Sequence, residues 1–123
     1  MKQIIVGTYE MGWERVQLVL REGTGGDFWL VPGDINYPRI KIGADQDNWK
    51  WLIICLLHEA VELAACRMKC RFKPSEEVAY DEYSYIFVMN HPQFSEIQGL
   101  TGEFVASCWD DLAKAWKKWG KKK

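Results

Sequence analysis

The segment from residue 51 to residue 66 reads WLIICLLHEAVELAAC and constrains the fold more than any other part of the chain. At about 100° per residue, a helix over this segment is apolar on all sides, except where His58, Glu59 and Glu62 share about a quarter of the circumference. Helices that are apolar all round are normally buried. We therefore expect a central helix with most of its side chains buried. An extended segment, or a helix exposed along one face, would overturn this interpretation and the site that depends on it.

The three polar residues of this segment need partners. Burying two carboxylates and an imidazole without partners costs on the order of several kcal/mol. His58 and Glu62 are four residues apart, so they project side by side, and a bound cation would satisfy both. Hydrogen bonds to Tyr80, Tyr83 or a backbone group would also satisfy them, as a polar cluster in the core. Both interpretations are open at this point.

Length and composition bound the class of protein. We expect the 123 residues to form a single domain, with a sheet-forming half at 1–44 and a helical half with a basic tail at 45–123. No apolar run reaches the roughly 20 residues of a membrane span, and the N-terminus lacks the features of a signal peptide. We therefore expect a cytoplasmic protein without membrane contact, whose four cysteines are reduced.

Hydrophobic periodicity predicts strands first and helices afterwards. Strands are expected at 4–6, 16–21, 27–31 and 39–43, with 16–21 and 27–31 forming a hairpin across a Gly-rich turn. Helices are expected at 49–69, from Ser75 to about Met89, and at 101–119. The predicted fold class is α+β, a small antiparallel sheet of three to four strands followed by three helices.

The pentapeptide HEAVE at residues 58–62 resembles the zincin motif HExxH on a helix that follows a sheet edge strand. In zincins the first and fifth positions bind metal, and the second is the general base. Glu82 follows Glu62 with 19 residues between them, which is similar to the third-ligand spacing of gluzincins. The resemblance, to minimal gluzincins and ImmA/IrrE-type peptidase domains, implies a zincin-like fold. It also implies metal ligands His58, Glu62 and Glu82, with Glu59 as the catalytic base.

The chain departs from this motif at its fifth position, which is Glu62 rather than histidine. Two carboxylate ligands would cancel the charge of a zinc ion, so a zinc-bound water would be acidified less. Oxygen-rich ligation also suits Mn²⁺, Fe²⁺ or Mg²⁺. We expect a divalent metal, zinc first and manganese or iron as alternatives. The expected function is a variant metal-dependent hydrolase, most simply a peptidase, using a metal-activated water. The alternative is a catalytically inactive zincin-like scaffold that binds other proteins.

Other residues are further candidates for the same site. Glu77, Asp81 and Glu103 are alternative third ligands, whereas His91 suits an exposed loop, and Cys66 and Cys70 suit burial as free thiols. The six lysines of residues 111–123 suit the C-terminal end of a helix, so nucleic acid is not an expected partner. A peptide or protein is the expected substrate or partner. The Trp-rich helix at 101–119 could also support a homo-oligomer.

Overall fold

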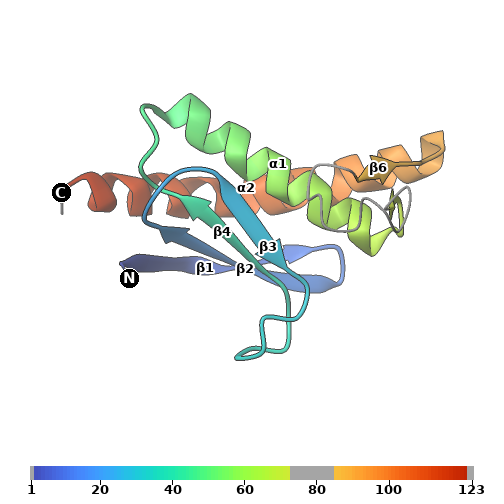
Figure 1. Ribbon diagram of the computed structural model, residues 1–123, viewed down its shortest axis with the longest axis horizontal. Helices are drawn as coiled ribbons and strands as arrows, with labels where there is room; N and C mark the ends of the chain where they lie inside the picture. The colour runs from blue at the N-terminus through green and yellow to red at the C-terminus, as the bar shows by residue number, and fades with distance from the viewer. Residues whose placement is uncertain (1, 73–84, 122–123) are drawn as a thin grey trace.

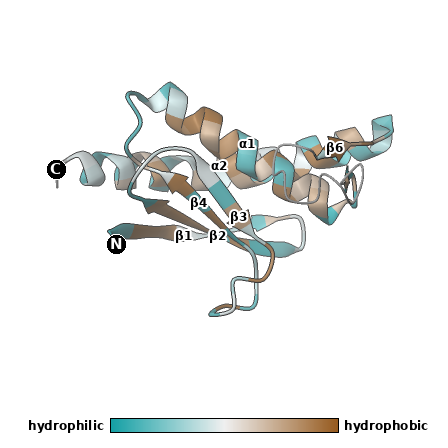
Figure 2. Cartoon of the chain, viewed as in Figure 1, coloured by the Kyte–Doolittle hydropathy of each residue, from teal (hydrophilic) through white to brown (hydrophobic). Residues whose placement is uncertain are grey.

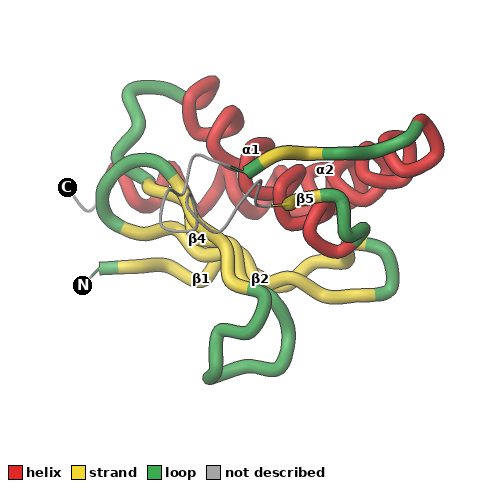
Figure 3. Tube along the Cα trace, turned by 45° about the vertical axis from the view of Figure 1, so that its right-hand side comes forward, coloured by secondary structure: helices red, strands yellow, loops and turns green. Residues whose placement is uncertain are grey.

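A computed structural model describes residues 2–72 and 85–121, in which two helices cover one face of a four-stranded sheet (Figure 1). The elements in chain order are β1 (Gln3–Met11), β2 (Glu14–Arg21), β3 (Gly26–Trp29), β4 (Arg39–Gly43), α1 (Trp49–Arg67), β5 (Arg71–Phe72), β6 (Ile86–Phe87) and α2 (His91–Lys121). The turned view in Figure 3 places both helices on the same side of the sheet. This arrangement confirms the predicted α+β class.

The sheet is mixed, so the prediction of an antiparallel sheet is wrong. The strand order is β1-β2-β4-β3, and β2 and β4 are parallel. β3 pairs with β4, not with β2 as the Gly-rich turn had indicated. The physical reason lies in the loop 22–26, which passes across the end of β4 instead of closing a hairpin. Gly43 N donates to Gly25 O at 2.8 Å, and a Cβ at residue 43 would lie only 2.4 Å from Gly23 O, so the crossing requires glycine.

The described residues contain two helices rather than the predicted three. The chain from His91 to Lys121 is one helix, which includes the predicted helix 101–119. Asn90 Oδ1 accepts from Gln93 N and Gln93 Oε1 accepts from Asn90 N, both at 2.9 Å, which is a capping box. Pro92 therefore lies in the first turn of α2, where proline is tolerated, and does not end a preceding helix.

The helix predicted from Ser75 to about Met89 is wrong at its described end. Ile86–Phe87 forms β6, which pairs antiparallel with β5. The beginning of that predicted helix lies outside the described residues. The start of α1 was predicted correctly, because Asn48 caps it, with Oδ1 accepting from Trp51 N at 3.0 Å.

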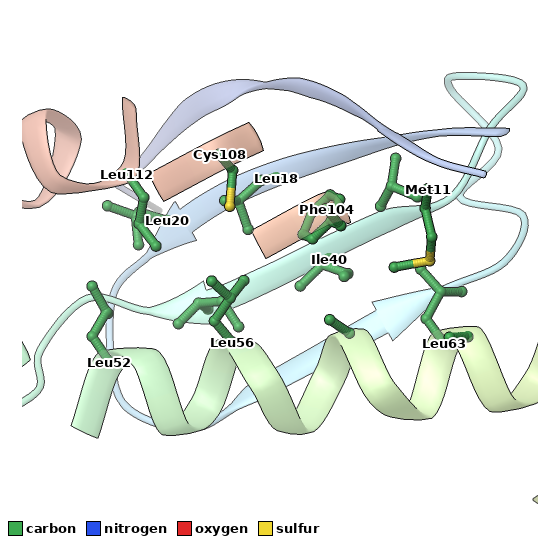
Figure 4. Close-up of a cluster of buried hydrophobic side chains, with 14 of the residues drawn as sticks. Met11, Leu18, Leu20, Ile40, Leu52, Leu56, Leu63, Phe104, Cys108 and Leu112 are labelled. Carbon is green, nitrogen blue, oxygen red and sulfur yellow. The ribbon is translucent and has the colours of Figure 1, made fainter. Parts of the chain in front are cut away.

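The core lies between the sheet and both helices (Figure 4). Its central side chains are fully buried and come from β2, β4, α1 and α2: Leu18, Leu20, Ile40, Leu52, Leu56, Leu63, Phe104, Cys108 and Leu112. Burying each leucine contributes about 1.5–3 kcal/mol. This packing fixes α1 against the sheet, and so it fixes the side chains that α1 presents elsewhere. Neither described helix is both long enough and apolar enough to span a bilayer.

The other face of α1 is exposed, so the prediction that most of its side chains are buried is wrong. Figure 2 shows a largely apolar helix interrupted by polar positions. Four of its apolar side chains are 40–47 % exposed: Trp51, Ile54, Leu57 and Val61. Burial of the whole helix therefore does not support a ligand, contrary to the sequence-based expectation. The candidate site rests instead on Glu59, which is 7 % exposed, and on the residues grouped with it.

Candidate metal centre

One turn of α1 brings His58, Glu59 and Glu62 together. His58 Nε2 lies 3.2 Å from Glu62 Oε2 and 3.8 Å from Glu59 Oε2. One potential ligand atom from each of the three residues lies within 4.8 Å of the others. Zinc bonds of 2.0–2.2 Å place tetrahedral ligand atoms roughly 3.3 Å apart. The His58–Glu62 pair therefore already has the separation of two ligands of one ion, and Glu59 needs a small adjustment.

The three side chains differ sharply in exposure. The side chain of His58 is 70 % exposed, that of Glu62 is 19 % exposed and that of Glu59 is 9 % exposed. The group thus opens to solvent on its imidazole side and is closed on the side of Glu59. An ion or a substrate would reach it from the exposed face of α1.

Glu59 is closed in by the edge strand β3. A Cβ built on Gly26 would lie 2.9 Å from Glu59 Cγ and 3.1 Å from Lys41 O, so only glycine fits between β4 and this side chain. Burial raises the pKa of the Glu59 carboxyl above its ordinary value of 4.5; His58 opposes the shift, and the Glu62 charge adds to it. Among the described residues, no lysine or arginine forms an ion pair with Glu59.

The charge of Arg21 favours the ionised form of Glu59, but the guanidinium of Arg21 makes its contacts with other residues. Its Nε lies 3.4 Å from Asp27 Oδ1, and its Nη1 donates to the carbonyls of Glu22 and Thr24. It therefore serves the loop that crosses the end of β4. Glu59 is left as a buried carboxylate beside an imidazole and a second carboxylate.

Glu62 is shared between two partners. Its Oε2 faces His58, and its Oε1 accepts from Arg71 Nη1 at 2.9 Å. Arg71 reaches this position because the chain reverses directly after α1. Lys69 adopts φ 58°, and Cys70 N donates to Ala65 O at 2.8 Å, which closes the end of the helix.

Two rings hold the guanidinium of Arg71 in place. Its Cζ lies 3.9 Å from the centroid of the Tyr85 ring and 5.3 Å from that of Phe28. Sequence patterns did not reveal Arg71, because its position depends on the reversal after α1 and on rings from β3 and from the segment preceding β6. Gly26 was missed for a similar reason, since its role depends on β3 lying beside α1.

Most of the other predicted ligands lie outside the described residues, namely Glu82, Glu77 and Asp81. The same is true of Tyr80 and Tyr83, the proposed partners in a polar cluster. Glu103 is not part of the group, because its Oε1 accepts from Gly12 N at 2.5 Å, at the turn between β1 and β2. His91 packs beside Phe94 at the start of α2.

The cysteines do not join the group in the described part of the chain. Cys70 is buried, and its Sγ donates to Met68 O at 3.4 Å. Burial raises the pKa of the Cys66 thiol above its ordinary value, although the charge of the nearby Arg71 opposes this shift. Both are free thiols, in accord with the sequence-based expectation.

Comparison with protein-family models, curated proteins and solved structures finds no significant match for the chain. The resemblance to zincins therefore rests on the sequence alone, on the motif at residues 58–62 and its spacing to Glu82. What the structure adds is a possible metal-ligand group of one histidine and two glutamates on one helix.

Proposed function

We propose that the protein is a variant metal-dependent hydrolase, most simply a peptidase, that uses a metal-activated water. One observation carries the proposal. A single turn of α1 brings an imidazole nitrogen and two carboxylates together, with possible ligand atoms within 4.8 Å of one another. One of those carboxylates, Glu59, is buried and has no lysine or arginine ion pair among the described residues. Zinc is the first candidate metal, and manganese and iron are the alternatives.

The residues divide the chemistry between them. A bound divalent cation supplies Lewis acidity, polarising the scissile carbonyl and lowering the pKa of a water. His58 and Glu62 would hold the cation, with an imidazole nitrogen and a carboxylate as ligands. Glu82 is the third ligand in this proposal, and it lies outside the described residues.

Glu59 is the general base of the proposed reaction. Its carboxylate accepts a proton from the attacking water and delivers that proton to the leaving amine nitrogen. Burial raises the pKa of Glu59, which brings the carboxyl closer to the pH at which a base can both accept and return a proton.

A Glu59→Gln variant tests this role. Glutamine retains the size of the side chain but cannot accept the proton, so the metal content should persist while peptide hydrolysis falls by roughly 10²-fold or more. The assay measures cleavage of an unstructured peptide mixture by protein loaded with zinc, manganese or iron. Glu103→Gln is the matched control, since Glu103 lies outside the group. A Glu59→Gln protein as active as the wild type contradicts the proposal, and so does a loaded wild type that cleaves nothing.

A second function is favoured by the exposed apolar face of α1. Trp51, Ile54, Leu57 and Val61 remain 40–47 % exposed, and a surface of this kind suits contact with another protein. In this alternative the protein is a zincin-like scaffold without catalysis. Such a scaffold needs no metal, so a folded metal-free protein whose melting temperature is unchanged by zinc favours it over the hydrolase.

The predicted homo-oligomer through the Trp-rich helix stays a prediction. Two tryptophans of that helix are engaged within the chain, because Trp116 Nε1 donates to Ala44 O and Trp119 Nε1 donates to Asp45 Oδ1. Trp109, 39 % exposed, packs edge-on against Trp49.

A further inference from the structure

Arg71 is a partly exposed cation fixed beside the candidate metal group. Its side chain is 21 % exposed, its Nη1 is held 2.9 Å from Glu62 Oε1, and its guanidinium packs on the Tyr85 ring. A guanidinium carries five N–H donors. Among the described residues its hydrogen bond is to Glu62, through one of its three nitrogens, which leaves donors in that part of the chain for a second carboxylate.

Glu62 would be shared between a bound divalent cation and Arg71, so it could not neutralise both. With Glu82 as the third ligand and Glu59 ionised, three carboxylates would balance the charges of the cation and the guanidinium, so no net charge draws the substrate. The guanidinium of Arg71 is instead the local, directional partner for a substrate that brings a carboxylate of its own.

The spacing matches the end of a peptide. The C-terminal carboxylate is separated from the carbonyl carbon of the last peptide bond by three covalent bonds, which span roughly 4 Å. Arg71 and the ligand atom Glu62 Oε2 are separated by one hydrogen bond and the width of one carboxylate. A C-terminal carboxylate on Arg71 would thus place the last peptide bond beside Glu62 Oε2, which itself lies 3.2 Å from His58 Nε2. The rings of Phe28 and Tyr85 beside the guanidinium would line the place of an apolar C-terminal side chain.

We propose that Arg71 anchors the free C-terminal carboxylate of a peptide, so that the site removes the last residue. This inference rests on the proposed hydrolase. The oxygen of water bonds to the carbonyl carbon of the last peptide bond, the C–N bond breaks, and the amine nitrogen takes a proton by way of Glu59. The products are a peptide shorter by one residue and a free amino acid. Arg71 binds substrate and determines specificity.

Ligand binding to zinc-loaded Glu59→Gln protein tests this assignment without turnover. The probes are N-acetyl-phenylalanine and its amide, which differ only in the carboxylate, and affinity is measured by NMR titration. The acid should bind at least about tenfold more tightly than the amide, because only a carboxylate accepts a charge-assisted pair of hydrogen bonds. Adding Arg71→Met should abolish the preference and leave affinity for the amide nearly unchanged.

Arg15→Met is the matched control, because Arg15 also packs over a tyrosine ring, at 4.9 Å from Tyr37, but lies on β2. It should keep the preference. Arg71→Lys gives a second variant if the methionine variant does not fold; it keeps the charge but loses the fork, so the preference should shrink. Equal binding of acid and amide to the Glu59→Gln protein, or a preference that survives Arg71→Met, overturns the assignment.

A zinc titration of the same proteins separates the two proposals. If zinc binds but acid and amide bind equally, only the role of Arg71 is wrong. If zinc does not bind the wild-type protein, the proposed hydrolase is wrong and this inference falls with it.

Discussion

The polar contacts where α2 meets the sheet differ from those on α1 in how their charges are balanced. Tyr9 Oη donates to Asp111 Oδ2 at 2.8 Å, and Trp119 Nε1 donates to Asp45 Oδ1 at 3.1 Å. Each of these contacts joins a neutral donor to a carboxylate, and no ionised group is buried. On α1, in contrast, the buried carboxylate of Glu59 faces an imidazole and a second carboxylate.

The polar contacts beside α2 therefore stabilise the fold, whereas the group on α1 is suited to binding. Neutral donors satisfy the carboxylates beside α2 at little cost, and the pairs contribute stability. The α1 group instead loses stability through a desolvated carboxylate, a cost typical of functional sites. Variants in each of the two regions test that contrast.

The largest expected effect is that of Glu62→Gln on metal binding. This change removes a charged ligand, so zinc affinity should fall by at least the roughly 100-fold that loss of an outer-shell partner can cause. Competition with a chromophoric chelator measures the change. An Asp111→Asn variant, on the other side of the comparison, should retain its zinc affinity within about twofold. Equal losses in both variants would erase the distinction between the two regions.

Gly26→Ala should lower peptide hydrolysis by the zinc-loaded protein by about tenfold, equivalent to about 1.4 kcal/mol in the activation barrier, and should leave zinc affinity nearly unchanged. The added methyl group would lie 2.9 Å from Glu59 Cγ and would displace the proposed base. Gly99→Ala provides the control, since a Cβ there meets nothing within 4 Å. It should leave hydrolysis unchanged and stabilise α2 by about 0.5–1 kcal/mol. An unchanged rate of hydrolysis in Gly26→Ala would show that the position of Glu59 does not matter for the reaction.

Tyr9→Phe should lower the free energy of unfolding by about 1 kcal/mol, because it removes the hydrogen bond to Asp111. Burial and that hydrogen bond raise the pKa of Tyr9, so its hydroxyl remains a donor throughout the usual pH range. Urea unfolding measures the loss, and zinc affinity should not change. A fully stable Tyr9→Phe protein would show that this contact does not hold the fold.

The smallest expected effect is that of Glu59→Gln on the free energy of unfolding, and its sign is opposite to that of Tyr9→Phe. In the metal-free protein at pH 7 it should raise the free energy of unfolding by on the order of 0.5–1 kcal/mol, because it removes a desolvated charge. The folded protein holds the Glu59 proton more tightly than the unfolded chain does. Stability from this group is therefore complete below about pH 4.5 and is lost as pH rises through the raised folded pKa.

Urea unfolding at several pH values checks this prediction. The wild type should lose more stability than Glu59→Gln between pH 4.5 and neutrality. A variant that is less stable than the wild type at pH 7 would mean that Glu59 has a favourable partner in the fold.

The sequence allowed the fold class to be predicted, but not the strand pairing. Periodicity located the strands around 16–21 and 39–43, and the cap at Asn48 located the start of α1. The parallel pairing of β2 and β4 depends on a long-range backbone contact between Gly43 and the loop 22–26, for which local patterns give no signal. Likewise, the helix predicted at 101–119 begins earlier, at His91, because the capping box of Asn90 and Gln93 starts it there.

The candidate site was predictable only where it is local. His58, Glu59 and Glu62 share one helical turn, so their spacing in the sequence sufficed to bring them together. Their exposure was not predictable, because an apolar sequence does not say which face the sheet covers. Arg71 and Gly26 belong to the surroundings of the site only through the tertiary fold.

Calorimetric zinc titration of tag-free, chelator-treated protein at pH 7 tests the central claim most directly. We predict one equivalent of bound zinc in the wild type, loss of that binding in His58→Ala, and full binding in His91→Ala, whose histidine lies outside the group. A wild-type protein that binds no zinc, or a His58→Ala protein that binds it equally well, would contradict the account.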